Sequence, residues 1–360
     1  MSKLSTFGHD LYEGRVSFNF IGRRKLWYSI SVAILILSGA GMIVRGFNMG
    51  IEFKGGVEFT AQIAATSANV DKLVNAVDDA GVPEAGDPIA VTSGNDAIRI
   101  QTKALTQDQA TKIEQSLTKA GATEVSQNLI GPSWGKQVAQ KALTGLAVFI
   151  VLVIFLIWGY FREWRMSVAA IVALAHDLVI TIGVYAWSGF EVTPATVTGL
   201  LTILGYSLYD TVVVFDKVRE NTRGFMKMTN RTYAESANLA INQTLVRSIN
   251  TSITALLPVA ALLIVGVAYL GNGPLKDLAL ALFVGMAAGA YSSIFIATPL
   301  ASQLKEMEPD VKAQALRVYA ARAKAAAATT AVAAPVTRDV VASGAAKRAQ
   351  PQRTTRSKRR

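Results

Sequence analysis

The stretch PATVTGLLTILGYSLYDTVVVFDKVR, residues 194–219, decides the class of this protein. It is apolar over most of its length, yet it carries Asp210 inside the hydrophobic run. An ionisable side chain at the bilayer centre costs about 2.5–3.5 kcal/mol on insertion scales, so it is tolerated where it faces protein, a partner or water. Asp210 is therefore a candidate functional residue. The alternative is a carboxyl group that only joins two helices.

The composition of the whole chain also indicates a membrane protein. Of its 360 residues, 51% are hydrophobic, and apolar runs near the spanning length of about 20 residues recur. Cysteine is absent and the two histidines are His9 and His176, which excludes disulfides, thiolate metal sites and a histidine cluster. We predict an α-helical polytopic protein with six transmembrane helices.

The charges are segregated along the chain as a membrane topology requires. Residues 301–360 carry 13 Lys and Arg against 4 Asp and Glu, whereas residues 45–137 carry 8 against 11. Basic loops stay in the cytoplasm. The predicted parts are a cytoplasmic N-terminus (1–25), transmembrane helix 1 (26–44), an extracytoplasmic domain (45–137), transmembrane helices 2–6 with basic cytoplasmic loops (138–300), and a basic, disordered cytoplasmic tail (301–360).

Residues 45–137 alternate between strand and helix patterns. VEFTAQI, DPIAVT, AIRIQT and TEVSQNLI have strand character, and residues 69–80 and 106–120 carry apolar side chains at helical spacing. Three glycines at positions 50, 55 and 56 predict a turn before the first strand. The order βαββαβ predicts a ferredoxin-like α+β domain between spans 1 and 2.

Few other polar groups fall within the predicted spans. Asp177, next to His176, lies about ten residues into the third span, and Arg247 lies near the start of the fifth. Counting about 1.5 Å per residue places Asp210 and Arg247 at comparable depths, so the two can form a pair. A guanidinium favours the charged carboxylate and desolvation disfavours it, so such a pair suits proton uptake and release. The alternatives are an Arg247 that only reaches the interface, an Asp177 that makes a structural bond, and a His176 satisfied within the core.

No nucleotide site is predicted. GPSWGKQ, residues 131–137, differs from a phosphate-binding loop because only three residues separate its glycines and Gln137 replaces the Ser or Thr. We expect no cofactor, no metal and no enzymatic activity, with an ion gradient as the energy source.

Several blocks together resemble the SecF family, the accessory subunits of the bacterial Sec translocase. GIEFKGG at 50–56 is similar to the family signature Gly-Ile-Asp-Phe-x-Gly-Gly, although Glu52 stands where Asp is usual. The further blocks follow the family order: ALAHDLVITIG (173–183), GYSLYDTVVVFDKVREN (205–221), INQTLVRSINTSITALLP (241–258) and GAYSSIFIATPL (289–300). The resemblance covers about residues 20–300. Tyr209, next to Asp210, stands where Asn is common.

The resemblance implies a function and a set of partners. SecF pairs with SecD in a twelve-span unit of the resistance–nodulation–division superfamily. That unit uses the proton-motive force to help move preproteins across the membrane after SecYEG and SecA have threaded them. By position, Asp210 and Arg247 match the family's intramembrane charged groups, and Asp177 is a third candidate for the proton relay. The implied location is the bacterial cytoplasmic membrane, with both termini in the cytoplasm.

Two other functions stay open at this point. A half-transporter of the same superfamily exports lipid or drug, and a non-transporting scaffold stabilises the Sec channel. The basic tail suits contact with anionic membrane lipid or with ribosomal RNA, and the sequence does not separate these two partners.

Overall fold

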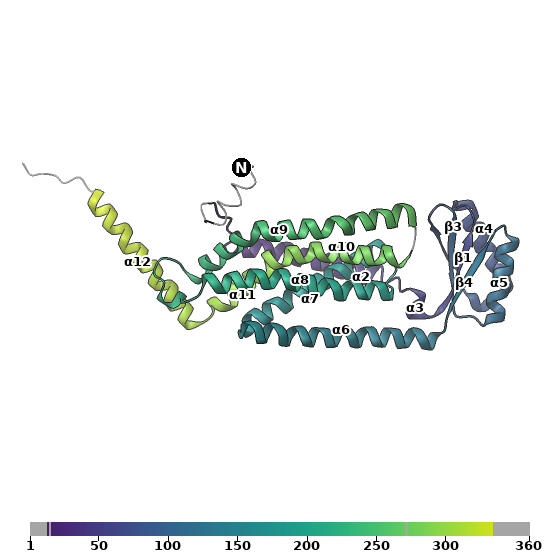
Figure 1. The fold of residues 1–360 in the computed structure, drawn as a ribbon, viewed down its shortest axis with the longest axis horizontal. Coiled ribbons are helices and arrows are strands. Elements are labelled where there is room, and N and C mark those ends of the chain that lie inside the picture. The colour runs from purple at the N-terminus through teal and green to yellow at the C-terminus, as the bar shows by residue number, and fades with distance from the viewer. Residues whose placement is uncertain (1–12, 14–15, 271–272, 334–360) are drawn as a thin grey trace, which may run out of the picture.

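The computed structural model describes residue 13, residues 16–270 and residues 273–333. A long bundle of helices carries a small sheet domain at one end (Figure 1). In the sheet domain, every helix and strand expected from the pattern is present. Its elements are β1 (Gly56–Gln62), α4 (Ser67–Asp78), the 3-10 turn η1 (Pro83–Ala85), β2 (Ile89–Ser93), β3 (Ala97–Thr102), α5 (Gln107–Lys119) and β4 (Val125–Ile130).

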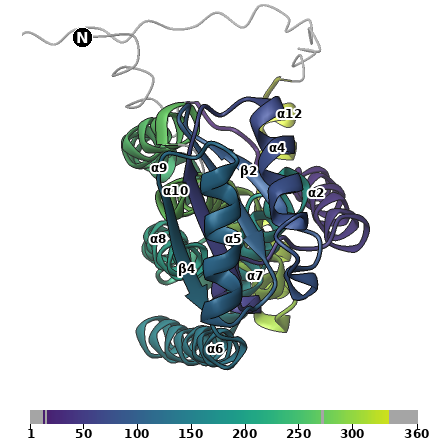
Figure 2. The ribbon, with the colours of Figure 1, turned by 90° about the vertical axis from the view of Figure 1, so that its right-hand side faces the viewer.

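The four strands form one antiparallel sheet in the order β2-β3-β1-β4. Side chains alternate between its two faces, because successive residues of a strand point to opposite sides. Val57, Phe59 and Ala61 of β1 are buried, and Glu58 between them points to the other face. Figure 2 shows α4 and α5 in front of the sheet with the bundle behind it, so the face that carries Glu58 is turned towards the bundle.

Local sequence explains where the helices of this domain begin. The Thr106 side chain accepts a hydrogen bond from the backbone N–H of Gln109, whose side chain accepts one from the Thr106 N–H. This capping box satisfies two N–H groups that the first turn leaves without helical partners. Further along α5, Ala110, Ile113 and Leu117 repeat every three to four residues and lie in the domain core.

The glycine-rich stretch before β1 contains one short helix, α3 (Ile51–Lys54), rather than only the predicted turn. Gly55 ends it with φ 76°, a conformation that favours glycine. At the next position, a Cβ on Gly56 would lie 2.5 Å from the Thr102 carbonyl oxygen on β3. Gly56 therefore allows the backbones of β1 and β3 to approach closely at the start of the sheet.

Six helical segments of the described chain are long and apolar enough to cross a membrane, as predicted. The first of them begins at Arg24, two residues before the predicted start at residue 26. The segments are α2 (Arg24–Val44), α6 (Pro132–Phe161), α7 (Trp164–Ser188), α8 (Pro194–Asn221), α9 (Tyr233–Val265) with the π-helix η3 (Gly266–Leu270), and a last span made of α10 (Pro274–Ser292), the π-helix η4 (Ser293–Ala297) and α11 (Thr298–Glu306). The 3-10 turn η2 (Phe225–Lys227) lies between α8 and α9.

Small residues bring the last span against α8. A Cβ on Gly285 would collide with Ile203, and a Cβ on Gly289 would lie 2.8 Å from the Cβ of Ser207. Real Cβ atoms do not approach this closely, so only glycine permits this separation of the two helices. The small-xxx-small pattern thus acts as a packing device, and it brings polar groups of the two helices within hydrogen-bond reach.

The interpretation of residues 301–360 as a disordered tail is wrong for its first part. Residues 309–333 form helix α12 (Pro309–Ala333), and Val311 and Val318 are buried. The Gln314 side-chain amide donates to the carbonyl oxygens of Met228 at 3.1 Å and Arg231 at 2.9 Å. Alanine has the highest helix propensity, and an apolar stripe gives this helix a surface to pack on. Residues 334–360 lie outside the described part.

Candidate functional site

Asp210 lies on α8 and is 5% exposed. Its Oδ1 accepts a hydrogen bond from the Ser248 hydroxyl of α9 at 2.8 Å, and its Oδ2 accepts one from the Ser293 hydroxyl in the last span. A buried charge is costly unless it is paired or hydrogen-bonded. Two serines from two neighbouring helices supply those bonds here.

Asp177 lies on α7 and is 1% exposed. Its Oδ2 accepts hydrogen bonds from the hydroxyls of Ser207, on α8, at 2.6 Å and Ser292, at the end of α10, at 2.8 Å. Ser207 and Asp210 are three residues apart on α8, so they share one face of that helix. The two carboxylates therefore lie along one seam formed by α7, α8 and the last span.

His176 adds an imidazole to this seam. Its Nδ1 lies 3.1 Å from Asp177 Oδ1, and its ring stacks on Tyr291 with the centroids 6.0 Å apart. Its Nε2 is buried and has no hydrogen-bond partner in the part of the chain that the structure describes. The hypothesis of a fully satisfied core histidine is therefore not met.

The structure places Arg247 beside Tyr209 and not beside Asp210. The Arg247 guanidinium is exposed and donates to the Tyr209 hydroxyl at 3.3 Å, and none of the ion pairs found among the described residues joins it to Asp210. Arg247 and Asp210 nevertheless lie at the same level of the bundle, because Ser248, the next residue, donates to Asp210. Neighbouring residues of an α-helix point about 100° apart. Arg247 and Tyr209 thus meet on the surface, while Ser248 and Asp210 meet inside.

Ser292 and Ser293 of the last span were not among the residues predicted from the sequence to form the site. They are consecutive, fully buried hydroxyls, and the other residues of the run 278–297 are apolar apart from Tyr291. Their signal was a pair of polar residues within the segment 289–300, but small hydroxyl side chains are common in membrane helices as packing groups. Among the described residues, no group of three or more His, Asp or Glu side chains could hold a metal ion.

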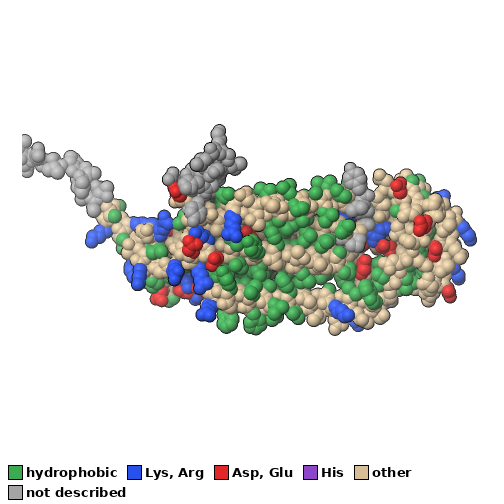
Figure 3. Space-filling model, viewed as in Figure 1, with side chains coloured by type: hydrophobic (Ala, Val, Ile, Leu, Met, Phe, Trp, Pro, Cys, Tyr) green, Lys and Arg blue, Asp and Glu red, His purple; other side chains and the backbone are tan. Residues whose placement is uncertain are grey.

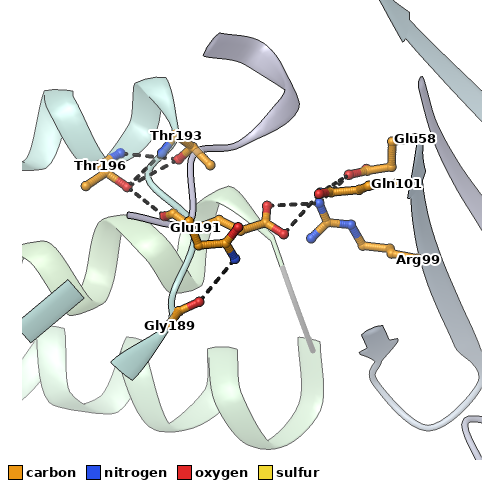
Figure 4. A network of polar contacts seen from close by, with 8 residues as sticks. Glu58, Arg99, Gln101, Gly189, Glu191, Thr193 and Thr196 are labelled. Atoms are coloured by element: carbon orange, nitrogen blue, oxygen red, sulfur yellow. Dashed lines mark hydrogen bonds and ion pairs between the residues drawn. The ribbon is translucent and has the colours of Figure 1, made fainter. Parts of the chain in front are cut away.

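A second polar cluster joins the sheet domain to the bundle (Figure 4). The Arg99 guanidinium of β3 pairs with Glu58 of β1 and lies 3.4 Å from Glu191, in the loop between α7 and α8. Gln101 donates to both carboxylates, at 3.1 Å and 3.0 Å. Burial works to lower the pKa of Arg99, but its hydrogen bond to Glu58 and the two negative charges outweigh burial and raise that pKa.

Backbone bonds run beside this cluster. Val192 donates to the Asn48 carbonyl at 2.8 Å, and Gly50 donates to the Val192 carbonyl at 2.9 Å. The segment after α2 and the loop before α8 are therefore joined directly. We name the whole contact, made by these backbone bonds and the side chains of the Arg99 cluster, the domain latch.

Comparison with known proteins gives the family. Residues 110–307 match the model of the protein export membrane protein SecD/SecF C-terminal region, and residues 40–66 match the SecD/SecF GG motif. The chain is 52% identical to the protein translocase subunit SecF of Streptomyces coelicolor, with 91% of this chain and 87% of the relative covered. It is 44% identical to the Mycobacterium tuberculosis SecF, with 88% and 75% covered.

A solved structure has the same fold. The crystal structure of the translocon-associated membrane protein SecDF from Thermus thermophilus matches with a TM-score of 0.70 at 32% identity. The match covers 81% of this chain and 39% of the longer SecDF chain. These relationships define a multi-pass membrane protein of the protein export class. The chain belongs to the SecD/SecF family, and its full-length curated relatives are SecF subunits of the protein translocase.

Proposed function

We propose that this chain couples proton movement through the membrane to the transport of preproteins across the bacterial cytoplasmic membrane. The observation that carries the proposal is a pair of buried carboxylates, Asp177 and Asp210, that receive hydrogen bonds from serine hydroxyls. A hydroxyl donates to an ionised carboxylate and accepts from a protonated one, so such a site suits both protonation states. The proton gradient then serves as the energy source, and no bound cofactor or nucleotide is needed.

Arg247 is the proposed switching partner of Asp210. Its guanidinium lies on the surface against Tyr209, one residue away from the Ser248 contact with Asp210. A small rotation of α9 brings the cation towards the carboxylate and favours the charged form of Asp210. A return to Tyr209 removes that cation and favours protonation. This alternation gives the relay two states.

The proposed partner is a SecD-type chain. This chain spans 39% of the Thermus SecDF chain, and that protein is described as translocon-associated. We infer that SecD supplies the other six spans and that the pair acts beside SecYEG and SecA on the translocating preprotein. On α6, Leu152, Phe155 and Leu156 are 61–63% exposed, which provides an apolar surface for membrane lipid or for this partner.

The proposed orientation places the sheet domain, a ferredoxin-like fold by its strand order, outside the cytoplasm. Figure 3 shows a broad hydrophobic zone over the bundle, and Lys and Arg side chains gathered at the end away from the sheet domain. Basic residues are enriched on the cytoplasmic side of membrane proteins. Both termini then lie in the cytoplasm, where the basic residues of α12 can reach anionic lipid or the ribosome.

The test uses membrane vesicles that complete preprotein translocation with and without a proton gradient. Asp210→Asn keeps the size and hydrogen bonding of the side chain but cannot titrate, so we expect it to lose the response to the gradient. Asp216→Asn is the matched control, because Asp216 lies on the same helix but is exposed. We expect its response to equal that of the unmodified chain.

The same assay separates the alternatives. A scaffold keeps its full gradient response in Asp210→Asn, and this outcome would refute the proposed coupling. A lipid or drug exporter leaves preprotein completion unchanged when the whole chain is deleted. The 52% identity to a curated translocase subunit favours preprotein transport over both alternatives.

A further inference from the structure

The last span contacts both buried carboxylates through two consecutive residues. Ser292, the final residue of α10, donates to Asp177, and Ser293, the first residue of η4, donates to Asp210. Both serines are 0% exposed. Two consecutive residues therefore carry one hydroxyl donor for each carboxylate.

Each of these hydroxyls also has a second acceptor on its own helix. The Ser292 Oγ lies 3.3 Å from the Gly289 carbonyl oxygen, and the Ser293 Oγ lies 3.2 Å from the Ala290 carbonyl oxygen. A serine hydroxyl has one hydrogen, so it donates to one acceptor at a time, and it accepts through its lone pairs. When the carboxylate takes up a proton, the hydroxyl can turn to its helix carbonyl and accept the new O–H.

We propose that Ser292 and Ser293 are the positioning residues of the proton site, a shared switch that keeps Asp177 and Asp210 hydrogen-bonded in both protonation states. The donors are fixed on one peptide unit, so a shift of the last span changes both contacts together. This inference rests on the proposed function for its role in transport. It adds Ser292 and Ser293, as two linked donors, to the two carboxylates of the proposed relay.

The backbone at this point supports the proposal. The α-to-π junction falls between the two serines, and π-helical turns are often found at functional sites. The close approach at Gly289 brings this turn against Ser207 on α8. The Thr298 hydroxyl donates to the Ser293 carbonyl oxygen at 3.0 Å, so a side chain satisfies this backbone acceptor of the π-helical turn.

Other titratable or charged groups lie around the two carboxylates. Asp177 also faces α8, the helix that carries Asp210, through its contact with Ser207. The neighbouring groups are His176 on α7, Tyr291 on α10, Tyr206 and Tyr209 on α8, and Arg247 on α9. All of them stay unchanged in the serine variants, so a change confined to one carboxylate reports on the serine that was replaced.

The experiment measures the protonation of each carboxylate directly. The full-length chain in lipid vesicles is treated with a hydrophobic carbodiimide, which reacts with protonated carboxyl groups, and the adducts at Asp177 and Asp210 are mapped by mass spectrometry across a range of pH. The variants are Ser292→Ala, Ser293→Ala and the corresponding threonine substitutions. Ser236→Ala is the control, because Ser236 is buried and its hydroxyl bonds only to the Thr232 carbonyl of its own helix.

The expected result is a shift specific to one carboxylate in each alanine variant. The serine bond to the ionised carboxylate is charge-assisted and therefore stronger than the bond to the protonated form. Its loss disfavours the ionised form more, so the Asp177 profile moves to higher pH by about one unit in Ser292→Ala, and the Asp210 profile moves likewise in Ser293→Ala. The threonine variants restore the profile because they keep the hydroxyl. A change in access alone alters the labelling rate at every pH and leaves the midpoint in place.

Two outcomes would overturn the inference. One is an unchanged midpoint at both carboxylates in both alanine variants, and the other is an equal shift in Ser236→Ala. The labelling needs no transport, so it separates this inference from the proposed function. If the serine shifts appear while Asp210→Asn keeps its gradient response, the proposed coupling fails and the switch stands.

Discussion

Arg99 in the sheet domain lies 3.4 Å from Glu191, in the loop from which α8 starts. Both side chains are about 12–13% exposed, and Glu58 completes the cluster. The Thr193 and Thr196 side chains form the capping box of α8 in the same loop. The domain latch thus fixes the sheet domain to the start of the helix that carries Asp210.

Arg99→Ala should loosen the domain latch. It leaves two carboxylates close together without their cation, a larger loss than that of an exposed pair. We expect hydrogen exchange at the Gly50 and Val192 amides to accelerate by about tenfold to a hundredfold, since each factor of ten corresponds to about 1.4 kcal/mol. Lys103→Ala, an exposed substitution one residue past β3, is the control. Unchanged exchange in Arg99→Ala would show that the backbone bonds and Gln101 hold the contact without Arg99.

Glu52 near the domain latch should make stability depend on pH. Burial raises the pKa of its carboxyl group, and the charges of Glu58 and Glu191 add to that increase. The folded state therefore keeps the Glu52 carboxyl group protonated at pH values above its ordinary pKa of 4.5. The stability that comes from this bound proton is lost as the pH rises through the folded-state pKa. Glu52→Gln should gain stability relative to the unmodified chain at neutral pH and lose that advantage below pH 4.5. Thermal denaturation in detergent at both pH values tests it, and an advantage that does not change with pH contradicts it.

Gly285→Ala should disrupt the contact between the last span and α8. Its new Cβ collides with Ile203, and overpacking of this kind costs about 1–3 kcal/mol. Gly205→Ala is the matched control, because a Cβ there meets no atom within 4 Å. Unfolding free energies in detergent should fall only in the first variant. Equal unfolding free energies in the two variants would mean that the last span and α8 can move apart to admit the new Cβ without loss of stability.

Arg247→Ala should abolish the response of preprotein completion to the proton gradient. Arg247→Lys should recover only part of it, because an ammonium does not reproduce the planar guanidinium. Tyr209→Phe removes only the hydroxyl that holds Arg247 at 3.3 Å, so we expect at most a few-fold change. A full response in Arg247→Ala would exclude Arg247 as the switching partner.

Cysteine labelling should establish the orientation, since the chain has no native cysteine. Asn95→Cys, in the turn between β2 and β3, should react with an impermeant reagent outside intact cells. Thr229→Cys, between η2 and α9, should react only after the membrane is opened. Both positions are exposed. Reaction of Thr229→Cys in intact cells would reverse the proposed topology.

Much of this protein follows from local sequence. The apolar runs are long enough to require spanning helices, because backbone polar groups cannot remain unpaired in lipid. Thr106 and Gln109 fix the start of α5, and the alternation of Val57, Glu58 and Phe59 fixes the two faces of the sheet. Asp210 was recognisable because a carboxyl group is rare inside an apolar run. Each of these signals lies within a few neighbouring residues.

Tertiary structure decided which polar groups meet. A shift of one residue on α9 turns a contact with Asp210 into a contact with Tyr209, and counting depth cannot resolve a rotation of about 100°. The link from Ser292 and Ser293 to two different helices depends on how the last span packs, more than eighty residues away from Asp210. The packing of α12 also depends on distant partners: Val311 and Val318 are buried, and Gln314 donates to the carbonyl oxygens of Met228 and Arg231. Sequence set the elements, and long-range packing selected their contacts, because the partners of a side chain depend on helix rotation and separation.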